Sequence, residues 1–383
     1  MMNENIKIKI VGDVMPSGVL YGKEDLFVSD AVVENLKDAD LRIANLECAV
    51  SPYCDSPHFD PEKMSRLMDT VWCIDEDLDR IVKMGFEVVC LANNHLYDLD
   101  KDGLIYTIQQ LDSLKILHCG AGLNLEEASK PAVITIGDKT IAILSFCDYR
   151  EETVGYVPFA TEDTPGLNPL YPMSYSCSEV KKYKELYDYV LVVPHWGVEH
   201  TWVATSAVIK DAKMLIDSGA DAILGGHPHR IQTPFYYKKK PVFPSLGNFF
   251  FPDRYLNKPR PTWYPAKGTD TSTYPRLYGY PWVEEPTIKV WPEKGRVEMI
   301  STLCVGDKIT MSYDYVYLNS DNYLGSLSKL TSVLSIIDVL QLKITLLMYK
   351  CKIFYIFVKV AHYMLNLIRR IYRRIKRVII NKK

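Results

Sequence analysis

Two histidines separated by a single proline, His227 and His229, lie in the stretch GGHPHRIQ of a chain that has only 8 histidines. Other polar side chains follow hydrophobic runs elsewhere in the chain. They are Asp13, Asn45 with Glu47, Asn94 with His95, and His195 with Glu199. Carboxylates, carboxamides and imidazoles without cysteine suit Mn²⁺, Zn²⁺, Fe or Mg²⁺. These residue types predict a site for one or two divalent metal ions.

Such a site would support hydrolysis. A carboxylate can bridge two cations, and two cations about 3.5–4 Å apart suit phosphoryl transfer or other ester hydrolysis. One cation alone would polarise an oxygen or lower the pKa of a bound water. Each element also has a purely structural interpretation, because an Asp after a strand is often a helix cap or turn residue. The five elements together favour the metal interpretation.

The segments that carry these residues alternate between strand and helix patterns. The runs IKIKIVGDVM, DLRIANLECAV, FEVVCLANNH, YDYVLVVPHWG and ADAILGGHPH read as strands that end in polar residues. Helices are expected over 101–114 and 204–218, and a hairpin with its turn at Gly137-Asp138. Further strands late in the chain predict mixed sheets. The pattern indicates an α/β protein whose ligands meet at the carboxyl edge of its sheets.

Six motifs in order resemble one family. GDVM, ANLECAV, LANNHLYDLDKDGL, HWGVEH, GGHPHRIQ and PSLGNFFF have the form of the CapA-type capsule (poly-γ-glutamate) synthesis proteins, which look like relatives of the calcineurin-like metallophosphoesterases. The resemblance covers roughly residues 6–305. It implies a four-layer α-β-β-α sandwich, with two mixed sheets face to face, helices outside and the site at one end of the sheets.

The resemblance also implies roles for single residues. Asp13 and His229 match ligands of a first metal, His195 and His227 match ligands of a second, and Glu47 stands roughly where the family has a bridging carboxylate. Further matches are Asn94, as a metal ligand, and His95, as a general acid or a residue that orients phosphate. Asp13 and His95 are therefore the expected catalytic residues, with Asn45, Glu199 and Asn248 as possible additional site residues.

One position departs from the wider phosphoesterase pattern, which has a histidine where this chain has Met15. One ligand of the first metal is then missing, and Glu199 is a candidate replacement oxygen. An extended segment would send His227 and His229 to opposite sides, which suits neighbouring metal positions.

The charge distribution separates the last part of the chain from the rest. The net charge of the whole chain is −2, but residues 342–383 hold 12 of the 45 Lys and Arg residues and no acidic residue, so the rest carries −14. Residues 352–380 have the pattern of an amphipathic helix. Lysines interrupt this part of the chain too often for a membrane-spanning helix. We expect 313–383 to be a basic helical tail that binds an anionic membrane surface. A solvated helix packed on the body or a partner is the alternative.

The remaining predictions concern organisation and function. Residues 1–312 are expected to form the metal-binding domain, with 252–282 as an inserted Tyr/Pro-rich loop that is either a lid or a surface insertion. The N-terminal residues lead directly into a strand, so we expect no signal peptide and a cytoplasmic protein peripherally bound to the inner face of the membrane. The nine cysteines indicate no disulfide framework, and no nucleic acid is expected as a partner.

Two functions remain open. The first is a metal-dependent hydrolase or transferase acting on a phosphorylated or acyl-linked intermediate of surface-polymer synthesis, whose substrate is an anionic polymer or a phosphorylated molecule. The second is a non-catalytic subunit that binds a metal or a polymer and belongs to a membrane polymer-synthase complex. The missing ligand at Met15 favours the second.

Overall fold

The chain divides into two compact units, Met1–Thr331 and Ser332–Lys383. The computed structural model describes residues 5–20, 23–51, 71–148, 158–256, 287–289, 296–306, 308–319 and 321–326. All of these lie in the first unit. The expected basic tail, 342–383, lies outside the described residues.

The larger sheet contains eight strands in the order β20-β19-β18-β1-β2-β5-β6, with β15 paired to β1. The strands are β1 (Ile6–Val14), β2 (Leu41–Leu46), β5 (Val88–Cys90), β6 (Leu117–Cys119), β15 (Asn248–Phe250), β18 (Arg296–Val305), β19 (Thr310–Leu318) and β20 (Leu324–Ser326). β1, β2, β5 and β6 run parallel, whereas β18, β19 and β20 pair antiparallel. The sheet is therefore mixed, as expected.

The smaller sheet contains six strands in the order β13-β14-β12-β11-β9-β8. They are β8 (Ala132–Ile136), β9 (Lys139–Cys147), β11 (Tyr189–His195), β12 (Ala222–Leu224), β13 (Phe235–Tyr237) and β14 (Lys240–Phe243). β9, β11, β12 and β14 are parallel neighbours. β8 and β9 form the expected hairpin, and Gly137 in its turn has φ 61°, a conformation that glycine adopts without steric cost.

Helices flank both sheets. They are α1 (Asp30–Lys37), α3 (Asp79–Met84), α4 (Asp100–Ser113), α5 (Leu125–Ser129), α7 (Met173–Lys184) and α8 (Ser206–Asp217). α4 and α8 are the helices expected from the sequence. The side chain of Thr205 accepts the backbone N–H of Val208 at the start of α8, and Gly219, with φ 121°, follows its end. Short 3₁₀ turns lie at η1 (Gly18–Leu20) and η2 (Asp75–Leu78).

Three further strand pairs lie outside the two sheets. They are β3 (Ala49–Val50) with β4 (Trp72–Cys73), β7 (Ala121–Gly122) with β10 (Gly166–Leu167), and β16 (Arg254–Leu256) with β17 (Thr287–Lys289).

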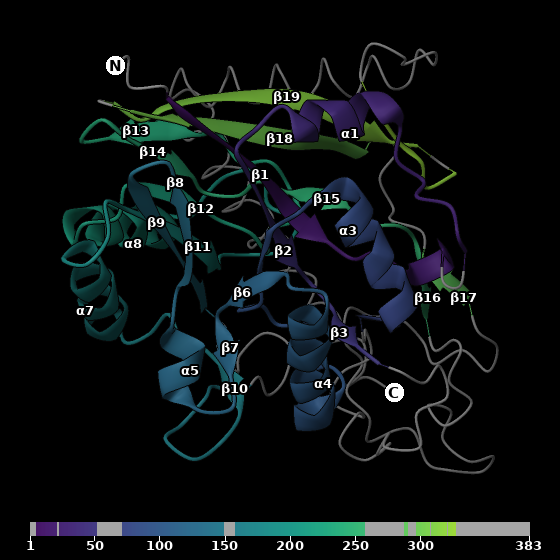
Figure 1. Ribbon diagram of the computed structural model, residues 1–383, viewed down its shortest axis with the longest axis horizontal. Coiled ribbons are helices and arrows are strands. Elements are labelled where there is room, and N and C mark those ends of the chain that lie inside the picture. Colours follow the sequence, from purple (N-terminus) through teal and green to yellow (C-terminus); the bar gives the residue numbers. More distant parts are fainter. Residues whose placement is uncertain are drawn as a thin grey trace, which may run out of the picture. The chain divides into compact units, whose positions relative to one another are not determined.

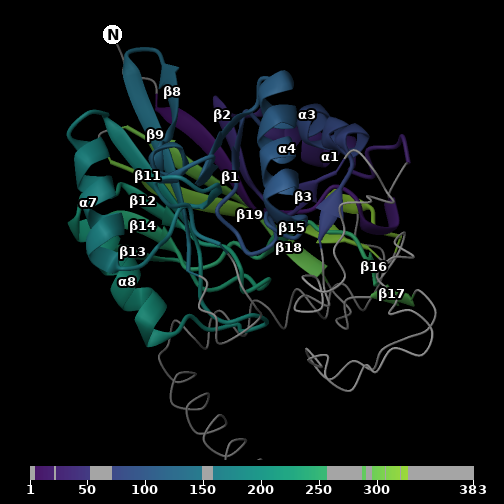
Figure 2. The ribbon, with the colours of Figure 1, turned by 90° about the horizontal axis from the view of Figure 1, so that it is seen from below.

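The elements form four layers. Figures 1 and 2 show α1, α3 and α4 on the outside of the larger sheet and α7 and α8 on the outside of the smaller one. Val89 of β5 packs in one core cluster with Leu104 of α4, and Val192 of β11 packs in another with Leu215 of α8. The alternate strand residues are equally buried and face the space between the sheets, where β6 meets β8 and β9. The expected four-layer α/β architecture is confirmed.

Two expected boundaries differ from the structure. Residue 312, the expected end of the domain, falls inside β19, and the sheet continues to Ser326. β19 lies near the sheet's edge, so its residues 310–315 are only half-buried or exposed, and such a strand gives a weak hydrophobic pattern. The expected loop 252–282 begins with Pro252, Asp253 and the paired strand β16, and the rest of it lies outside the described residues.

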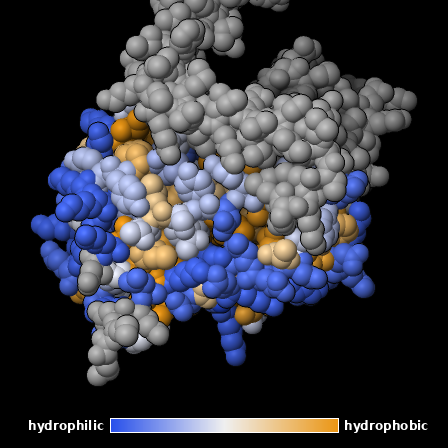
Figure 3. Space-filling model, turned by 90° about the horizontal axis from the view of Figure 1, so that it is seen from above, coloured by the Kyte–Doolittle hydropathy of each residue, from blue (hydrophilic) through white to orange (hydrophobic). Residues whose placement is uncertain are grey.

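The surface of the described part is mainly hydrophilic in the view of Figure 3, and its hydrophobic residues are interrupted by hydrophilic ones. Within the described part of the chain, no helix has the length and hydrophobicity that a membrane span requires.

Candidate metal centre

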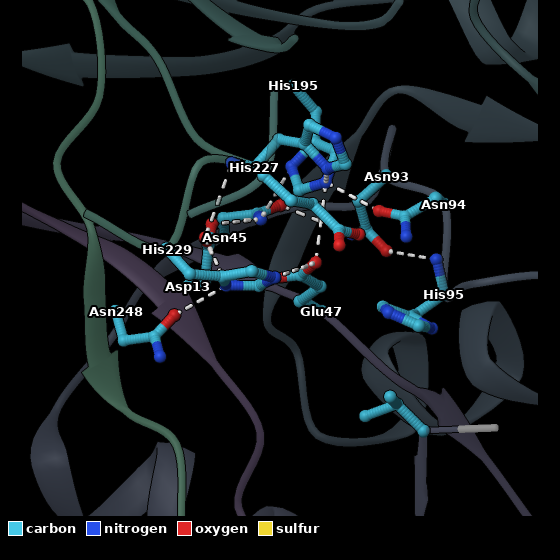
Figure 4. Close-up of polar contacts among 12 residues, drawn as sticks. Asp13, Asn45, Glu47, Asn93, Asn94, His95, His195, His227, His229 and Asn248 are labelled. Carbon is cyan, nitrogen blue, oxygen red and sulfur yellow. Dashed lines mark hydrogen bonds and ion pairs between the residues drawn. The ribbon is translucent and has the colours of Figure 1, made fainter. Parts of the chain in front are cut away.

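The polar residues expected at strand ends meet where the two sheets come together. Asp13 lies near the end of β1 and Asn45 near the end of β2, with Glu47 directly after it. His195 ends β11 on the other sheet, and the loop after β12 carries His227 and His229. Figure 4 shows these side chains pointing toward one another. Parallel strands in both sheets therefore deliver their carboxyl-end residues to one place, as the sequence pattern predicts.

Two glycines allow the backbone segments to approach this closely. A Cβ atom on Gly12 would lie 1.8 Å from the carbonyl oxygen of Gly247. A Cβ atom on Gly226 would lie 2.6 Å from Oδ1 of Asp13. Glycine at these two positions lets the end of β1 and the segments after β12 and β14 converge.

Two groups of buried acidic and imidazole side chains result, and Glu47 belongs to both. One group contains Glu47, His195 and His227, and the other contains Asp13, Glu47 and His229, with ligand atoms within 4.8 Å of one another in each. Oε1 of Glu47 lies 3.3 Å from Nε2 of His195 and 3.8 Å from Nε2 of His229. Either group could hold a metal ion, and the shared carboxylate stands between them.

The geometry of the HPH segment differs from the extended conformation expected. His227 has φ 90° and His229 has φ 52°, so both residues adopt positive φ on either side of Pro228. Their ring centroids are 6.3 Å apart. The backbone N–H of His227 lies 3.3 Å from Oδ2 of Asp13, which accepts its hydrogen bond. The two rings do enter different groups, but a tight turn places them there, not the alternation of a strand.

Carboxamides fix the histidine rings and the aspartate. Nδ1 of His229 donates to Oδ1 of Asn248 at 2.7 Å, which leaves its Nε2 on the side of Glu47. Asn94 Oδ1 lies 2.6 Å from Nε2 of His195, and Asn45 Nδ2 donates to Oδ1 of Asp13 at 2.8 Å. Such contacts orient the side chains of metal sites.

Asn93 is a site residue that was not expected from the sequence. Its Nδ2 donates to the carbonyl of Leu46 at 2.8 Å, and its Oδ1 accepts the backbone N–H of His95 at 3.1 Å. Asn93 thus ties the end of β2 to the loop after β5. The doubled asparagine in LANNH was the available signal, since both carboxamides follow the same strand.

Burial and the neighbouring charges set the protonation of the site. Burial raises the pKa of Asp13, but the hydrogen bond with His229, the nearby rings of His195 and His229 and the amide of Asn45 together lower it to about 2. Burial lowers the pKa of His227 to about 4 and that of His195 well below its usual range. At neutral pH the aspartate is ionised and these two imidazoles are neutral, which are the forms that bind a cation.

His95 lies beside the two groups and is paired with Asp98. Nδ1 of His95 is 2.7 Å from Oδ2 of Asp98, and the same oxygen accepts the backbone N–H of Val71 at 2.6 Å. The Asp98 side chain is 1% exposed and that of His95 is 12% exposed. Asp98 is not among the residues expected from the sequence, although its spacing of three residues from His95 was an available signal.

Two residues discussed for the first metal site lie outside both groups. The charge of Glu199 raises the pKa of His227, but its carboxylate belongs to neither group. Met15 packs in the hydrophobic core cluster of the larger sheet, and its sulfur accepts the backbone N–H of Ser17 at 3.3 Å. The group that contains Asp13 thus has one histidine, whereas the other group has two.

The residues present fit a divalent cation. Two carboxylates and three imidazoles converge at buried positions, without a cysteine sulfur in either group. Such oxygen and nitrogen donors suit Mn²⁺, Zn²⁺, Fe or Mg²⁺.

Two known proteins similar to this chain are named for capsule or PGA biosynthesis. The chain is 28% identical over 256 residues to the capsule biosynthesis protein CapA of Bacillus anthracis, with 65% of this chain and 60% of that protein covered. It is 33% identical over 179 residues to the PGA biosynthesis protein CapA of Bacillus subtilis, with 46% and 45% covered. The matches thus cover less than two thirds of either relative. Among solved structures, a 5'-nucleotidase of Candida albicans aligns with this chain at 10% sequence identity and a TM-score of 0.41. The alignment covers 90% of this chain and 58% of the nucleotidase chain.

A family match covers most of the domain that contains the site. The family described as Bacterial capsule synthesis protein PGA_cap matches residues 7–253, a range that includes every residue of the two metal-binding groups. The chain belongs to this bacterial capsule synthesis protein family.

Proposed function

We propose that the protein is a metal-dependent hydrolase or transferase that acts in the synthesis of a capsule or another surface polymer. The observation that carries this proposal is the pair of buried groups that share Glu47. A shared carboxylate between two sets of ligands is the arrangement that places two cations close enough to act on one ester or acyl group. The similarity to proteins named for capsule and PGA biosynthesis supports the polymer context.

The proposal assigns each side chain a position. Asp13, Glu47 and His229 would hold one ion, and Glu47, His195 and His227 a second, with Asn94 as a further oxygen ligand. Asn45 and Asn248 would orient Asp13 and His229. A divalent ion held by these residues would polarise the scissile group and lower the pKa of bound water.

His95 would supply the proton. Its Nδ1 is held by Asp98, so Nε2 is the ring nitrogen that can donate to a leaving group or stabilise the charge that develops on the substrate. The substrate would be a phosphorylated or acyl-linked intermediate, or the anionic polymer itself. A polymer-synthase complex is the partner that this role implies.

Met15 supports a second candidate function. It occupies the position of the expected histidine, and its side chain is 1% exposed within the core, so the Asp13 side of the site has fewer ligands. A site with one well-equipped position suits a subunit that holds a metal or a polymer end without turnover.

A metal and turnover measurement separates the two functions. The protein is purified without chelator, its bound metal is measured by mass spectrometry, and a generic phosphomonoester and phosphodiester are assayed with added Mn²⁺. We expect at least one equivalent of metal and turnover that falls by about a hundredfold or more in Asp13→Asn and His229→Ala. His118→Ala is the matched control, because His118 also pairs with an aspartate, Asp112, but lies outside the site.

Each outcome discriminates. Metal well below one equivalent without turnover would remove the enzyme proposal. One tightly bound equivalent without turnover on either ester would favour the binding subunit. Equal losses in His118→Ala and His229→Ala would show that the variants report folding and not the site.

A further inference from the structure

A cation and an aromatic ring lie together next to the metal-binding residues. The guanidinium carbon of Arg230 is 5.4 Å from the centre of the Trp202 ring. Arg230 directly follows His229, and its Nη1 donates to the carbonyl oxygen of His229 at 2.6 Å. Trp202 lies in the loop that begins after His195 and is 38% exposed. Trp202 therefore lies on the loop that follows β11, and Arg230 on the loop after β12 that carries His227 and His229.

Hydrogen bonds hold these two loops against each other. The side chain of Gln232 donates to the carbonyl of Thr201 at 2.9 Å, and the backbone N–H of His200 donates to the carbonyl of Pro228 at 2.8 Å. The His200 ring lies 5.8 Å from that of His229, at an angle of 33°. The position of the guanidinium relative to the site is thus fixed by contacts on both loops.

This arrangement suits recognition of an oxyanion. A guanidinium can lie over an aromatic face and still present N–H donors along its edge in the geometry that carboxylates and phosphates accept. A half-buried cation beside an exposed tryptophan also loses less binding energy to solvent than a free surface lysine.

We infer that Arg230, held by Trp202, binds a carboxylate or phosphate group of the substrate next to the bond that the metal site acts on. The inference rests on the proposed function, because it names the substrate class of the same site. It makes Arg230 a specificity-determining residue that selects an anionic polymer or a phosphorylated intermediate over a neutral ester. Trp202 is a positioning residue that acts through Arg230.

Binding of short anionic probes to the Mn²⁺-loaded full chain tests this role. Titration calorimetry is done with a γ-linked glutamate pentamer, with the same pentamer carrying side-chain amides, and with tripolyphosphate. Arg230→Met is expected to weaken binding of the anionic pentamer or of tripolyphosphate about tenfold. Its effect on binding of the amidated pentamer should be much smaller. Arg230→Lys is expected to recover only part of the loss, because an ammonium cannot form the paired contact. Trp202→Phe should retain more affinity than Trp202→Leu.

Lys213→Met is the matched control, because Lys213 lies 5.4 Å from the ring centre of Tyr237, in a cation–aromatic pair built from α8 and β13. If Arg230→Met weakens binding of the anionic pentamer alone, the ligand is a carboxylate. If it weakens binding of tripolyphosphate alone, the ligand is a phosphate. The inference is overturned if Arg230→Met and Lys213→Met lose the same affinity for the anionic probes. It is also overturned if Arg230→Met loses the same affinity for the acidic and the amidated pentamer. Absence of metal-dependent turnover in the unsubstituted protein would instead count against the proposed function, since binding of the probes is measured without turnover.

Discussion

Oδ2 of Asp98 contacts Nδ1 of His95 and the backbone N–H of Val71 at the same time. This links the ring of His95 to the backbone at Val71, which directly precedes β4, through one buried carboxylate. An aspartate in this position fixes the tautomer and orientation of the ring, as in other His–Asp pairs. The role of His95 therefore depends on Asp98.

We predict that Asp98→Asn lowers kcat by about ten- to a hundredfold, because the amide can still accept from Val71 but lacks the carboxylate charge beside the ring. His95→Ala should lower kcat by about a hundredfold or more. The double variant should be no slower than His95→Ala, since the two side chains act as one unit. Steady-state kinetics on the generic ester give the three values. Asp112→Asn, which breaks the His118 pair, should leave kcat near the unsubstituted value. If the losses of kcat in the two single variants add up in the double variant, Asp98 acts independently of His95.

Burial of His227 also makes the stability of the metal-free protein depend on pH. Its pKa falls from the usual 6.5 to about 4 on folding, so the unfolded chain takes up a proton between these values while the folded chain does not. The free energy of unfolding must therefore fall as pH falls through this window, by about 3 kcal/mol from His227, with His195 acting in the same direction. The depressed pKa of Asp13 has no effect there, because its contribution is lost only below about pH 4.

Urea denaturation in excess chelator at pH 6.5 and pH 4.5 measures this dependence. The drop in unfolding free energy should be smaller in His227→Gln than in the unsubstituted protein, because glutamine takes up no proton. The same drop in both proteins would show that His227 is not buried in its neutral form.

At the scale of elements, the close approach of β1 to the segment before β15 shapes the site. The backbone N–H of Asp13 donates to the carbonyl of Gly247 at 3.0 Å, and this contact places β15, which begins with Asn248, beside the end of β1. The approach is possible because residue 12 has no side chain. Asn248 reaches His229 only through this arrangement.

We predict that Gly12→Ala lowers the free energy of unfolding by about 1–3 kcal/mol or more, because its methyl group would lie 1.8 Å from the oxygen of Gly247 and the backbone must shift. Gly325→Ala in β20 is the matched control, since its added Cβ would have nothing within 4 Å. Urea midpoints of the two variants should differ clearly. Similar midpoints would show that the segment around Gly247 can move away without cost.

At the scale of the whole molecule, the sequence predicts that the basic tail recruits the protein to an anionic membrane surface. The described fold closes with β20 at Ser326, and the first compact unit ends at Thr331. We predict that a chain ending at Thr331 keeps the thermal midpoint and metal content of the full chain but no longer sediments with vesicles that contain phosphatidylserine. Neutral phosphatidylcholine vesicles should bind neither chain. Equal sedimentation of both chains with the anionic vesicles would contradict the proposal for the tail.

The sequence by itself determined the local elements and which residues end the strands. Hydrophobic runs that end in polar residues predicted β1, β2, β5 and β11, and the helices α4 and α8 lie within two residues of their expected positions. These patterns are local, because each depends on residues a few positions apart. Six motifs in order were also sufficient to indicate the family.

Only the tertiary structure decided how these residues meet. It showed that His227 and His229 enter the two groups through positive φ angles, and that Asn93 and Asp98 support neighbouring residues. It also showed that β19 and β20 extend the larger sheet. The physical reason is the same in each case. Contacts between residues as distant as Asp13 and His229 depend on the packing of two sheets and on the space that glycines leave, which no local pattern encodes.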